Sequence, residues 1–328
     1  MTLRIKIDPD AIDRGAIDGA ARTLLDGGLV AFPTETVYGL GGRADRVESV
    51  ERIYAAKHRP EFDPLIVHVA DVDGLTGVVA DPPELFFDLT DRFWPGPLTL
   101  VVRRGPGVPA AVTSGLPTVA VRSPAHPVAQ ALLRTTGVPV AAPSANTFGH
   151  VSPTNADHVL DDLAGRCDLV LDAGDSVLGI ESTVLKVEHD HVVVLRHGAL
   201  PIEDIEPIDV REAQGAISES PGRSARHYSP SSPMAVMDPR NRAPLPLEGG
   251  VYLGYDETAR ALPDGWTFVP LGSRGALGPV AARLYRVLRS IDRRQPAMIV
   301  AELSGRPGRG RAIDDRLTRA ASGNVLDP

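Results

Sequence analysis

Cysteine is nearly absent from this chain, because Cys167 is the only one among 328 residues. A single thiol excludes an intrachain disulfide and a cysteine-rich zinc site, and it fits a reducing compartment. No apolar run approaches the ~18–20 residues that span a bilayer. The first residues, MTLRIKIDPD, reach acidic side chains too early for a signal peptide. The sequence therefore predicts a cytoplasmic protein without a membrane partner.

Positive charge is also in short supply. The chain carries 34 Lys and Arg against 42 Asp and Glu, which gives a formal net charge of −8. This balance argues against a general nucleic-acid coat or a polybasic membrane-surface protein, although a local basic cleft remains compatible with it. Glycine and proline number 32 and 30, and their share lies below the ~25–30% of low-complexity chains. We therefore expect many tight turns.

The common short signatures of catalysis are missing from the sequence. It contains no GxxxxGK[ST] phosphate loop, and no GxGxxG fingerprint follows a strand. HExxH, CxxC and GxSxG, which serve zinc, redox and acyl-transfer chemistry, are missing as well. If the protein binds a nucleotide, it must bind the phosphates with a different structural motif.

Short apolar runs alternate with helical patterns, which is typical of α/β domains. Irregular strand spacing and apparent hairpins favour a mixed sheet over a purely doubly wound one. The segment SESPGRSARHYSPSSP, residues 218–233, has the composition of a linker. Residues 234–328 repeat the α/β pattern on a smaller scale. Helices are predicted at 12–25, 47–56, 83–93, 126–136, 154–163, 276–291 and 312–321.

Polar residues gather where predicted strands end, which is where α/β sheets hold ligands. Residues 33–41, PTETVYGLG, offer hydroxyls and a carboxylate, and Gly39 and Gly41 would let the backbone approach a ligand. An ordinary turn is an equally good interpretation. Arg122 ends the strand of TVAVRSP, where it either pairs with a carboxylate or binds an anionic ligand.

Lys57 and Arg59 stand two residues apart in AKHRPEFDPLIVHV. Two cations held by nearby prolines suit phosphate oxygens, and arginine can bind them bidentately. A solvated, basic helix end is the alternative. His68 closes the strand LIVHV, a position where a histidine is more often structural than catalytic.

Short polar donors follow the predicted strand of VPVAAPSANTFGHVSPT. Ser144, Asn146 and Ser152 suit the sugar or phosphate of a nucleotide, while Ser152 can also cap the helix that follows Pro153. Farther along, the sequence GIESTV places Ser182 at the opening of a strand, and VVVLR ends in Arg196.

Taken together, these segments resemble the L-threonylcarbamoyladenylate synthases in their two-domain form. The order PTETVYGLG, K-x-R-P, PLIVH, FWPGPLTLV, V-R-x-P, APSAN, SPT and ESTV follows the family pattern over residues 10–205. The linker and the ending GRGRAIDDRLTRAAS resemble the longer form. The resemblance implies a YrdC-like catalytic domain at 1–217 with a twisted open mixed sheet. It also implies an active-site lid in linker 218–233 and a smaller Rossmann-like α/β domain at 234–328.

The resemblance further implies a nucleotidyltransferase. Its substrates would be ATP with Mg²⁺, L-threonine and bicarbonate, and its products threonylcarbamoyl-AMP and pyrophosphate. Downstream threonylcarbamoyl-transfer machinery would use the product to form threonylcarbamoyladenosine at position 37 of tRNAs reading codons that begin with A. The tRNA itself is expected to bind only indirectly or weakly.

Site residues are also implied by the resemblance. Lys57 and Arg59 are expected to be catalytic, because they would stabilise the charge on the phosphates. No side chain is expected to ligate a metal directly. ATP is expected at Lys57, Arg59, Asp63, Thr118, Ser144, Asn146, Ser152, Arg196 and Tyr228. L-threonine is expected at Thr36, His68, Arg122, Ala142 and Ser182, with Arg122 on its carboxylate.

Two positions depart from the family pattern. Asp63 stands where Asn is common, and an acid beside a triphosphate is unfavourable unless it faces Mg²⁺ or Arg59. Ala142 stands where Ser is frequent, so any contact there comes from the backbone. His68 is a weak candidate for the base that takes the proton of the threonine amine.

Two other functions remain as alternatives. The first is a non-catalytic RNA-binding or ribosome-assembly module, against which the net charge of −8 argues. The second is a carbamoyl transferase acting through carbamoyl-adenylate. Relatives of that kind carry cysteine-rich zinc segments in much longer chains, and this sequence has one cysteine.

Overall fold

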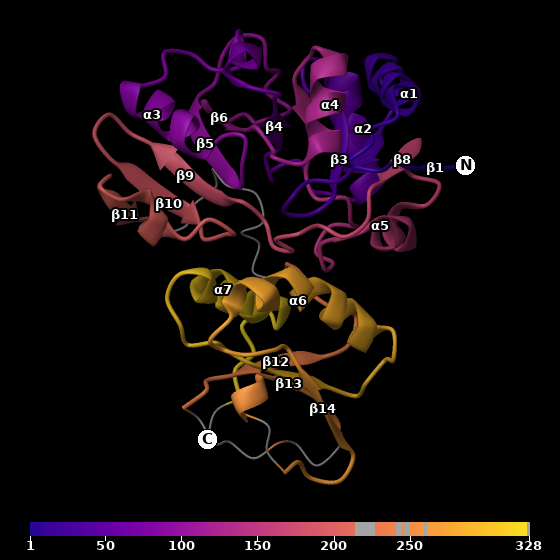
Figure 1. Ribbon diagram of the computed structural model, residues 1–328, viewed down its shortest axis with the longest axis vertical. Helices are drawn as coiled ribbons and strands as arrows, with labels where there is room; N and C mark the ends of the chain where they lie inside the picture. Colours follow the sequence, from indigo (N-terminus) through magenta and orange to yellow (C-terminus); the bar gives the residue numbers. More distant parts are fainter. Residues whose placement is uncertain (214–226, 241–244, 246–248, 259–260, 327–328) are drawn as a thin grey trace. The chain divides into compact units, whose positions relative to one another are not determined.

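The computed structural model describes residues 1–213, 227–240, 245, 249–258 and 261–326 (Figure 1). They divide into two compact units. The first unit holds Met1–Phe148, Pro153–Val177 and the described residues from Glu181 to 213; the second holds Gly149–Ser152, Leu178–Ile180 and the described residues from 227 onward. The domain boundaries proposed from the sequence stay predictions, and residues 218–226 of the predicted linker lie outside the described residues.

A mixed sheet forms the first unit, and its strands follow the order β1-β8-β2-β3-β7-β4-β6-β5-β9-β10-β11. Neighbours β4 and β6 run parallel, as do β5 and β9, whereas β3 and β7 or β5 and β6 run antiparallel. The strands are β1 (Leu3–Lys6), β2 (Val30–Phe32), β3 (Gly39–Arg43), β4 (Ile66–His68), β5 (Leu98–Arg103), β6 (Thr118–Arg122), β7 (Val140–Ala141), β8 (Leu169–Asp172), β9 (Thr183–Val187), β10 (Val192–Arg196) and β11 (Val210–Glu212). The predicted mixed α/β architecture is confirmed.

Local sequence signals explain where the helices begin and end. Helix α1 follows Asp13, whose carboxylate accepts from two backbone N–H groups of the first turn. Helix α4 has proline at its first position and ends at Gly137 with φ 66°. The first unit contains α1 (Arg14–Leu25), α2 (Val47–Lys57), α3 (Glu84–Phe93), α4 (Pro127–Thr136), α5 (Ala156–Leu163) and the 3₁₀ turns η1 (Val72–Leu75) and η2 (Ile202–Ile205).

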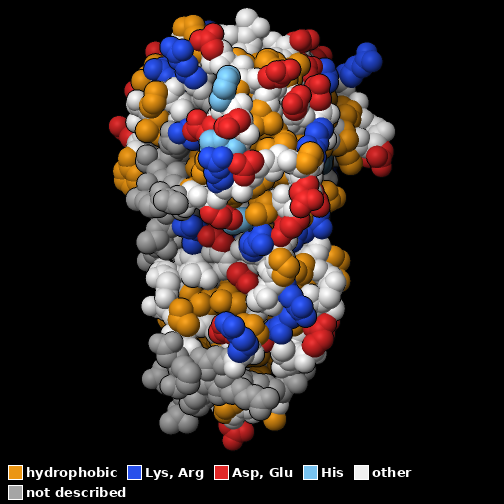
Figure 2. All heavy atoms as spheres, turned by 90° about the vertical axis from the view of Figure 1, so that its left-hand side faces the viewer, with side chains coloured by type: hydrophobic (Ala, Val, Ile, Leu, Met, Phe, Trp, Pro, Cys, Tyr) orange, Lys and Arg blue, Asp and Glu red, His pale blue; other side chains and the backbone are white. Residues whose placement is uncertain are grey.

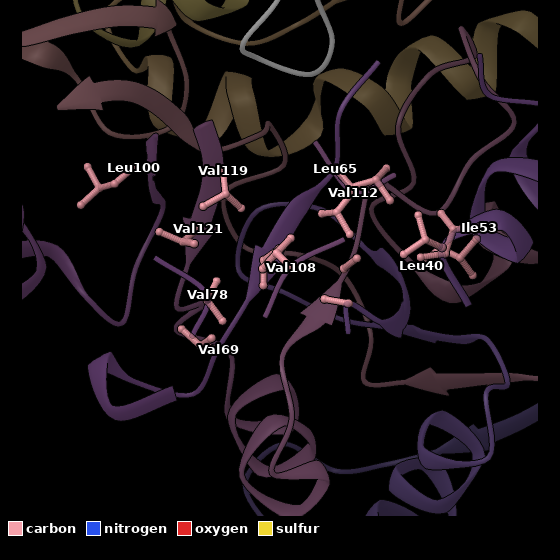
Figure 3. Close-up of a cluster of buried hydrophobic side chains, with 14 of the residues drawn as sticks. Leu40, Ile53, Leu65, Val69, Val78, Leu100, Val108, Val112, Val119 and Val121 are labelled. Atoms are coloured by element: carbon pink, nitrogen blue, oxygen red, sulfur yellow. The ribbon is translucent and has the colours of Figure 1, made fainter. Parts of the chain in front are cut away.

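Successive side chains of β4 and β6 point to opposite faces of the sheet, and one of these faces packs into the large apolar cluster. Val67 and Val121 point into the large apolar cluster, where Leu100, Val119 and Val121 lie near one another (Figure 3). Their neighbours Ile66 and Ala120 belong to a separate apolar cluster. Because successive side chains of a strand point to opposite faces, His68 and Arg122 leave the same face as Ile66 and Ala120.

Strand β3 was not predicted from the sequence. The sequence predicts a turn or a ligand-binding segment at residues 33–41, but Gly39 and Gly41 lie in β3, which pairs with β2 and β7. A Cβ at Gly41 would lie 2.9 Å from side-chain atoms of Phe32 and Val140. Gly41 therefore allows close packing inside the sheet, which a loop interpretation does not require.

The second unit contains a four-stranded sheet of parallel strands in the order β12-β15-β13-β14. Helices α6 and α7 lie on the same face of this sheet (Figure 1), whereas a doubly wound Rossmann-like sheet carries helices on both faces. The elements are β12 (Met234–Met237), β13 (Gly250–Gly254), η3 (Asp256–Thr258), β14 (Trp266–Pro270), α6 (Leu277–Asp292), β15 (Ile299–Glu302) and α7 (Arg309–Ala320). Among the residues described, none of the helices has the length and apolar character to cross a membrane.

Candidate active site

Arg122 is the centre of a buried polar cluster at the carboxyl end of β6. It is 4% exposed, and its Nη2 lies 2.6 Å from Oε1 of Glu35. Its Nη1 donates to Oγ1 of Thr36 at 2.9 Å, and its Nε donates to the carbonyl of Gly96 at 3.2 Å. These bonds use three of the five guanidinium N–H donors. The cluster thus joins Thr36 and Arg122, both predicted threonine ligands, and leaves donors for a carboxylate.

Glu35 is the residue of this cluster for which the sequence suggests no specific role. Its second oxygen accepts from the backbone N–H of Ala125 at 3.0 Å. Thr34 supports the same segment, because its hydroxyl lies 2.8 Å from that of Thr36 and donates to the carbonyl of Val37. Both expectations for Arg122 are therefore relevant. It pairs with the carboxylate of Glu35, and its remaining N–H donors suit an anionic ligand.

His68 lies opposite Arg122 in the register of β4 and β6. The imidazole is buried, Nδ1 donates to the carbonyl of Ile66 at 3.2 Å, and the ring meets Phe32 edge-on. Burial and, next, the charge of Arg122 lower the pKa of His68 to about 3. Such an imidazole stays neutral near pH 7 and is a poor proton acceptor. This argues against His68 as the base for the threonine amine.

The depressed pKa of His68 predicts an acid-sensitive fold. Between its ordinary pKa of ~6.5 and the folded value of about 3, the unfolded chain binds a proton that the folded chain does not. Its contribution to stability is thus complete above pH ~6.5 and is lost as pH falls, by up to ~1.4 kcal/mol per pH unit. Urea unfolding at pH 7 to 4.5 should show a smaller pH slope for His68→Gln than for the wild type. The exposed His189→Gln serves as control, and equal slopes for all three proteins contradict the prediction.

Lys57 ends α2 and is buried against the loop that holds Ser144 and Asn146. Its Nζ donates to the backbone carbonyls of both residues at 2.5 Å, and Phe148 N donates to the carbonyl of Lys57 at 2.8 Å. Burial, followed by the charge of Arg59, lowers the pKa of Lys57 well below its usual value. The structure therefore brings the predicted nucleotide-binding residues of K-x-R and S-x-N together. The amino group of Lys57 donates to the carbonyls of the S-x-N loop.

Arg59 and Asp63 form a buried ion pair, with 2.9 Å between Nη2 and Oδ2. Arg59 also donates to the carbonyls of Asp63 and Pro64, and its guanidinium lies 5.7 Å from the ring centroid of Phe148. Asp63 thus faces Arg59, which is one of the two arrangements that make an acid acceptable at this position. The pair reduces the positive charge that Arg59 offers to a phosphate.

Arg196 is the last residue of β10, and it contacts Ser182, which directly precedes β9. Arg196 Nη2 donates to Ser182 Oγ at 3.1 Å and to its carbonyl at 3.0 Å. Ser182 Oγ also lies 2.7 Å from Thr99 Oγ1, a contact that the sequence analysis missed because nothing local marks a threonine inside a strand. The predicted ATP and threonine residues therefore share one hydrogen-bonding group here.

Four further predicted residues occupy different settings. Thr118 opens β6 and lines a cavity of about 690 Å³ with Val101 and Lys186, within the ~300–1,000 Å³ range of small-molecule sites. Ala142 is buried and donates its backbone N–H to Ile66 O at 2.9 Å. Ser152 and Tyr228 belong to the second unit.

The charges of these clusters favour an anionic ligand. Four buried cations, Lys57, Arg59, Arg122 and Arg196, lie in the same segments as three buried carboxylates, those of Glu35, Asp63 and Glu181. Within the described ranges, no group of three or more His, Cys, Asp or Glu is arranged to hold a metal ion. Asp63 is the carboxylate paired with Arg59. It would therefore be the acidic side chain nearest to a divalent ion bound to phosphates at Arg59.

Both the N-terminal and the C-terminal part of this chain match families of known proteins. Residues 22–198 match the family described as "Telomere recombination", and residues 200–322 match "Threonylcarbamoyl-AMP synthase, C-terminal domain". The chain is 43% identical over 323 residues to the threonylcarbamoyl-AMP synthase of Bacillus subtilis, covering 94% of this chain and 93% of that protein. Identity to the Pyrococcus abyssi enzyme is 38% over 339 residues and 99% of both chains.

A solved structure agrees with the sequence relatives. The crystal structure of P. abyssi Sua5 complexed with L-threonine superposes with a TM-score of 0.87, 35% identity and 99% coverage of both chains. The mixed-sheet unit followed by a parallel α/β unit, together with relatives named threonylcarbamoyl-AMP synthase, places the chain among two-domain nucleotidyltransferases. The chain belongs to the threonylcarbamoyl-AMP synthase family. The family resemblance and the enzyme prediction are confirmed; the roles of individual residues stay predictions.

Proposed function

We propose that this enzyme joins L-threonine, bicarbonate and ATP into L-threonylcarbamoyladenylate and releases pyrophosphate. The observation that carries this proposal is the buried cluster of Arg122, Glu35 and Thr36, whose remaining donors suit an amino-acid carboxylate. The L-threonine bound to the P. abyssi relative supports the same substrate.

The proposed chemistry needs no side-chain nucleophile. The neutral threonine amine attacks the carbon of CO₂ and releases a proton, or attacks the carbon of bicarbonate and releases water, and in either case forms a carbamate. A carbamate oxygen then attacks the α-phosphorus in line, an O–P bond forms, and the bond to pyrophosphate breaks. Positive charge from Arg59 and from the Mg²⁺ of the ATP substrate would stabilise the leaving group.

Placement carries most of the proposed rate enhancement. Arg122 would hold the threonine carboxylate, and the loop with Ser144 and Asn146 would hold the nucleotide. Orienting reactants can supply up to ~7–11 kcal/mol. Since neutral His68 hydrogen-bonds without taking a proton, it would orient threonine in this scheme, and the amine would lose its proton to solvent or to bicarbonate.

The product is a mixed anhydride that water hydrolyses, so we further propose direct use by threonylcarbamoyl-transfer machinery for position 37 of tRNA. The alternative of an RNA-binding module has little support from surface charge. On the face in Figure 2, Lys and Arg are interspersed with Asp and Glu, without a continuous basic stripe among the described residues. A cytoplasmic location remains a prediction.

Pyrophosphate release tests the proposed function. Purified enzyme is supplied with ATP and Mg²⁺, and L-threonine or bicarbonate is omitted in turn. Release that requires both supports the synthase. Release without threonine contradicts it and favours carbamoyl-adenylate chemistry or ATP hydrolysis, while no release at all favours the RNA-binding alternative, to be checked by gel shift at physiological salt.

Removal of the Asp63 charge should improve ATP binding. In Asp63→Asn, Arg59 keeps its two carbonyl acceptors but loses the carboxylate that neutralises it. We expect the KM for ATP to fall roughly threefold to tenfold, or about 1 kcal/mol, with a steeper dependence on salt.

The matched control for this variant is Asp209→Asn, which removes an exposed acid paired with Arg211 and should leave the KM unchanged. A rise in KM for Asp63→Asn that excess Mg²⁺ corrects would contradict the prediction. Such a result would assign Asp63 to the metal that accompanies ATP.

A further inference from the structure

A cavity of about 410 Å³ lies in the first unit, beyond the end of β4. Its walls come from the segment between Val69 and Gly74, from the last turn of α4 and from the residues Gly137 to Pro139 that lead into β7. The volume falls within the ~300–1,000 Å³ range of small-molecule sites. None of these residues is among those predicted to bind threonine or ATP, so the cavity is separate from the site described above.

Apolar side chains form the inner wall of this cavity. Val69 and Leu133 are both 3% exposed, and Val69 belongs to the large apolar cluster (Figure 3). Val138 and Pro139 are half-buried and complete the wall. A wall of this kind suits the aliphatic part of a ligand.

The polar groups of the cavity carry a surplus of negative charge. Asp71 Oδ2 pairs with Arg134 Nη1 at 2.9 Å, and Arg134 Nη2 also donates to Oε1 of Gln130. Asp73 is exposed and has no cationic partner among the residues that the structure describes. Helix α4 ends here with Gly137 at its C-cap, and the carbonyl end of a helix carries partial negative charge. One guanidinium thus faces two carboxylates and a helix end.

The inner wall is hydrogen-bonded to the segment that carries Arg122. Val69 N donates to Arg122 O at 3.0 Å. The carbonyl of Ala70 accepts from Ser123 Oγ at 2.7 Å and from Gln130 Nε2 at 3.0 Å. A ligand that packs against Val69 and Ala70 would therefore steady the backbone from which the Arg122 guanidinium extends.

We propose that this cavity binds a small organic ammonium ion with a short aliphatic chain, and that its occupancy tightens threonine binding at Arg122. The ammonium group would lie between Asp73 and the carbonyl end of α4, with its chain on the apolar wall. The bound ligand would restrict the contact of Ala70 with Ser123 and so preorganise Arg122. The effect on threonine rests on the proposed function, whereas the binding of the amine does not.

The test compares n-butylammonium with n-butanol, which has the same chain without the charge. Amide chemical shifts of Gly74 and Gly137 in isotope-labelled protein report binding at matched ionic strength. We expect n-butylammonium to bind about fivefold to thirtyfold more tightly, as a cation at a partly buried helix end does. Asp73→Asn should weaken its binding about twofold to fivefold. The matched control Asp88→Asn, which removes an exposed acid on α3, should leave it unchanged.

A second variant separates this cavity from the threonine site. Val138→Trp fills the cavity and should abolish amine binding while pyrophosphate release continues. In the wild type, saturating n-butylammonium should lower the KM for L-threonine about fivefold, at the lower end of allosteric couplings, with an unchanged KM for ATP. Val138→Trp should remove this effect, and Asp73→Asn, which changes only a surface charge, should weaken it.

The outcomes separate the two parts of the proposal. Equal affinity for the amine and the alcohol, or amine binding that is unaffected by Asp73→Asn, overturns the ammonium site. Amine binding with an unchanged KM for threonine overturns the link to Arg122. In either case, pyrophosphate release that requires threonine and bicarbonate would leave the proposed synthase activity intact.

Discussion

Replacement of Arg122 by methionine should abolish threonine use while leaving ATP binding largely intact. The guanidinium is the buried cation proposed to hold the substrate carboxylate, and it is fixed by Glu35, Thr36 and Gly96. Charged hydrogen bonds of this kind contribute about 2–5 kcal/mol when one partner is removed. The KM for threonine should therefore rise at least 10²-fold in the pyrophosphate-release assay, with the KM for ATP changed less than threefold.

A loss of stability has to be separated from this loss of binding. Arg122→Met leaves the Glu35 carboxylate buried without its partner, which destabilises a fold by about 3–5 kcal/mol. The double variant Arg122→Met with Glu35→Gln removes that charge and should recover most of the stability, as measured by urea unfolding. Threonine use should not recover. A double variant with near-wild-type KM for threonine would refute the role of Arg122.

Glu35 also marks the limit of what the sequence could predict. The strand TVAVRSP ends in an arginine, so a carboxylate or an anionic ligand was expected there. Glu35 lies 87 residues earlier in the chain, and its approach to Arg122 depends on the strand order β2-β3-β7-β4-β6. Sequence patterns give each strand its faces but not its neighbours, and so the pair became visible only in the folded sheet.

Helices and strands with a clear apolar period were predicted well, and those without one were missed. Helix α4 (Pro127–Thr136) lies within a residue of its expected bounds, 126–136, and strand β6 (Thr118–Arg122) ends at Arg122 as expected. Strand β3 (Gly39–Arg43), by contrast, contains the residues GLGGR. Glycine disfavours strands by intrinsic propensity, and here packing against Phe32 and Val140 overrides that preference.

Replacement of Lys57 by methionine should disable the nucleotide site by loosening a loop. The sequence presented Lys57 as a phosphate-binding cation, but its Nζ donates to the carbonyls of Ser144 and Asn146. Methionine has a similar length and no donor, so both carbonyls lose a charge-assisted bond worth about 1.5–3 kcal/mol. Turnover should fall about 10²–10³-fold, the effect of removing one preorganised donor from an active site.

Hydrogen exchange distinguishes a loosened loop from a lost phosphate contact. If Lys57 acts through the loop, amide exchange at Asn146 and Phe148 accelerates in ligand-free Lys57→Met, because both amides bond within this junction. Lys6→Met, at the exposed end of strand β1, is the control and should change neither exchange nor turnover. If Lys57→Met loses turnover while amide exchange at Asn146 and Phe148 is unchanged, Lys57 instead binds the phosphates of ATP directly. The two results therefore decide whether the lysine of K-x-R binds the substrate or builds the loop that does.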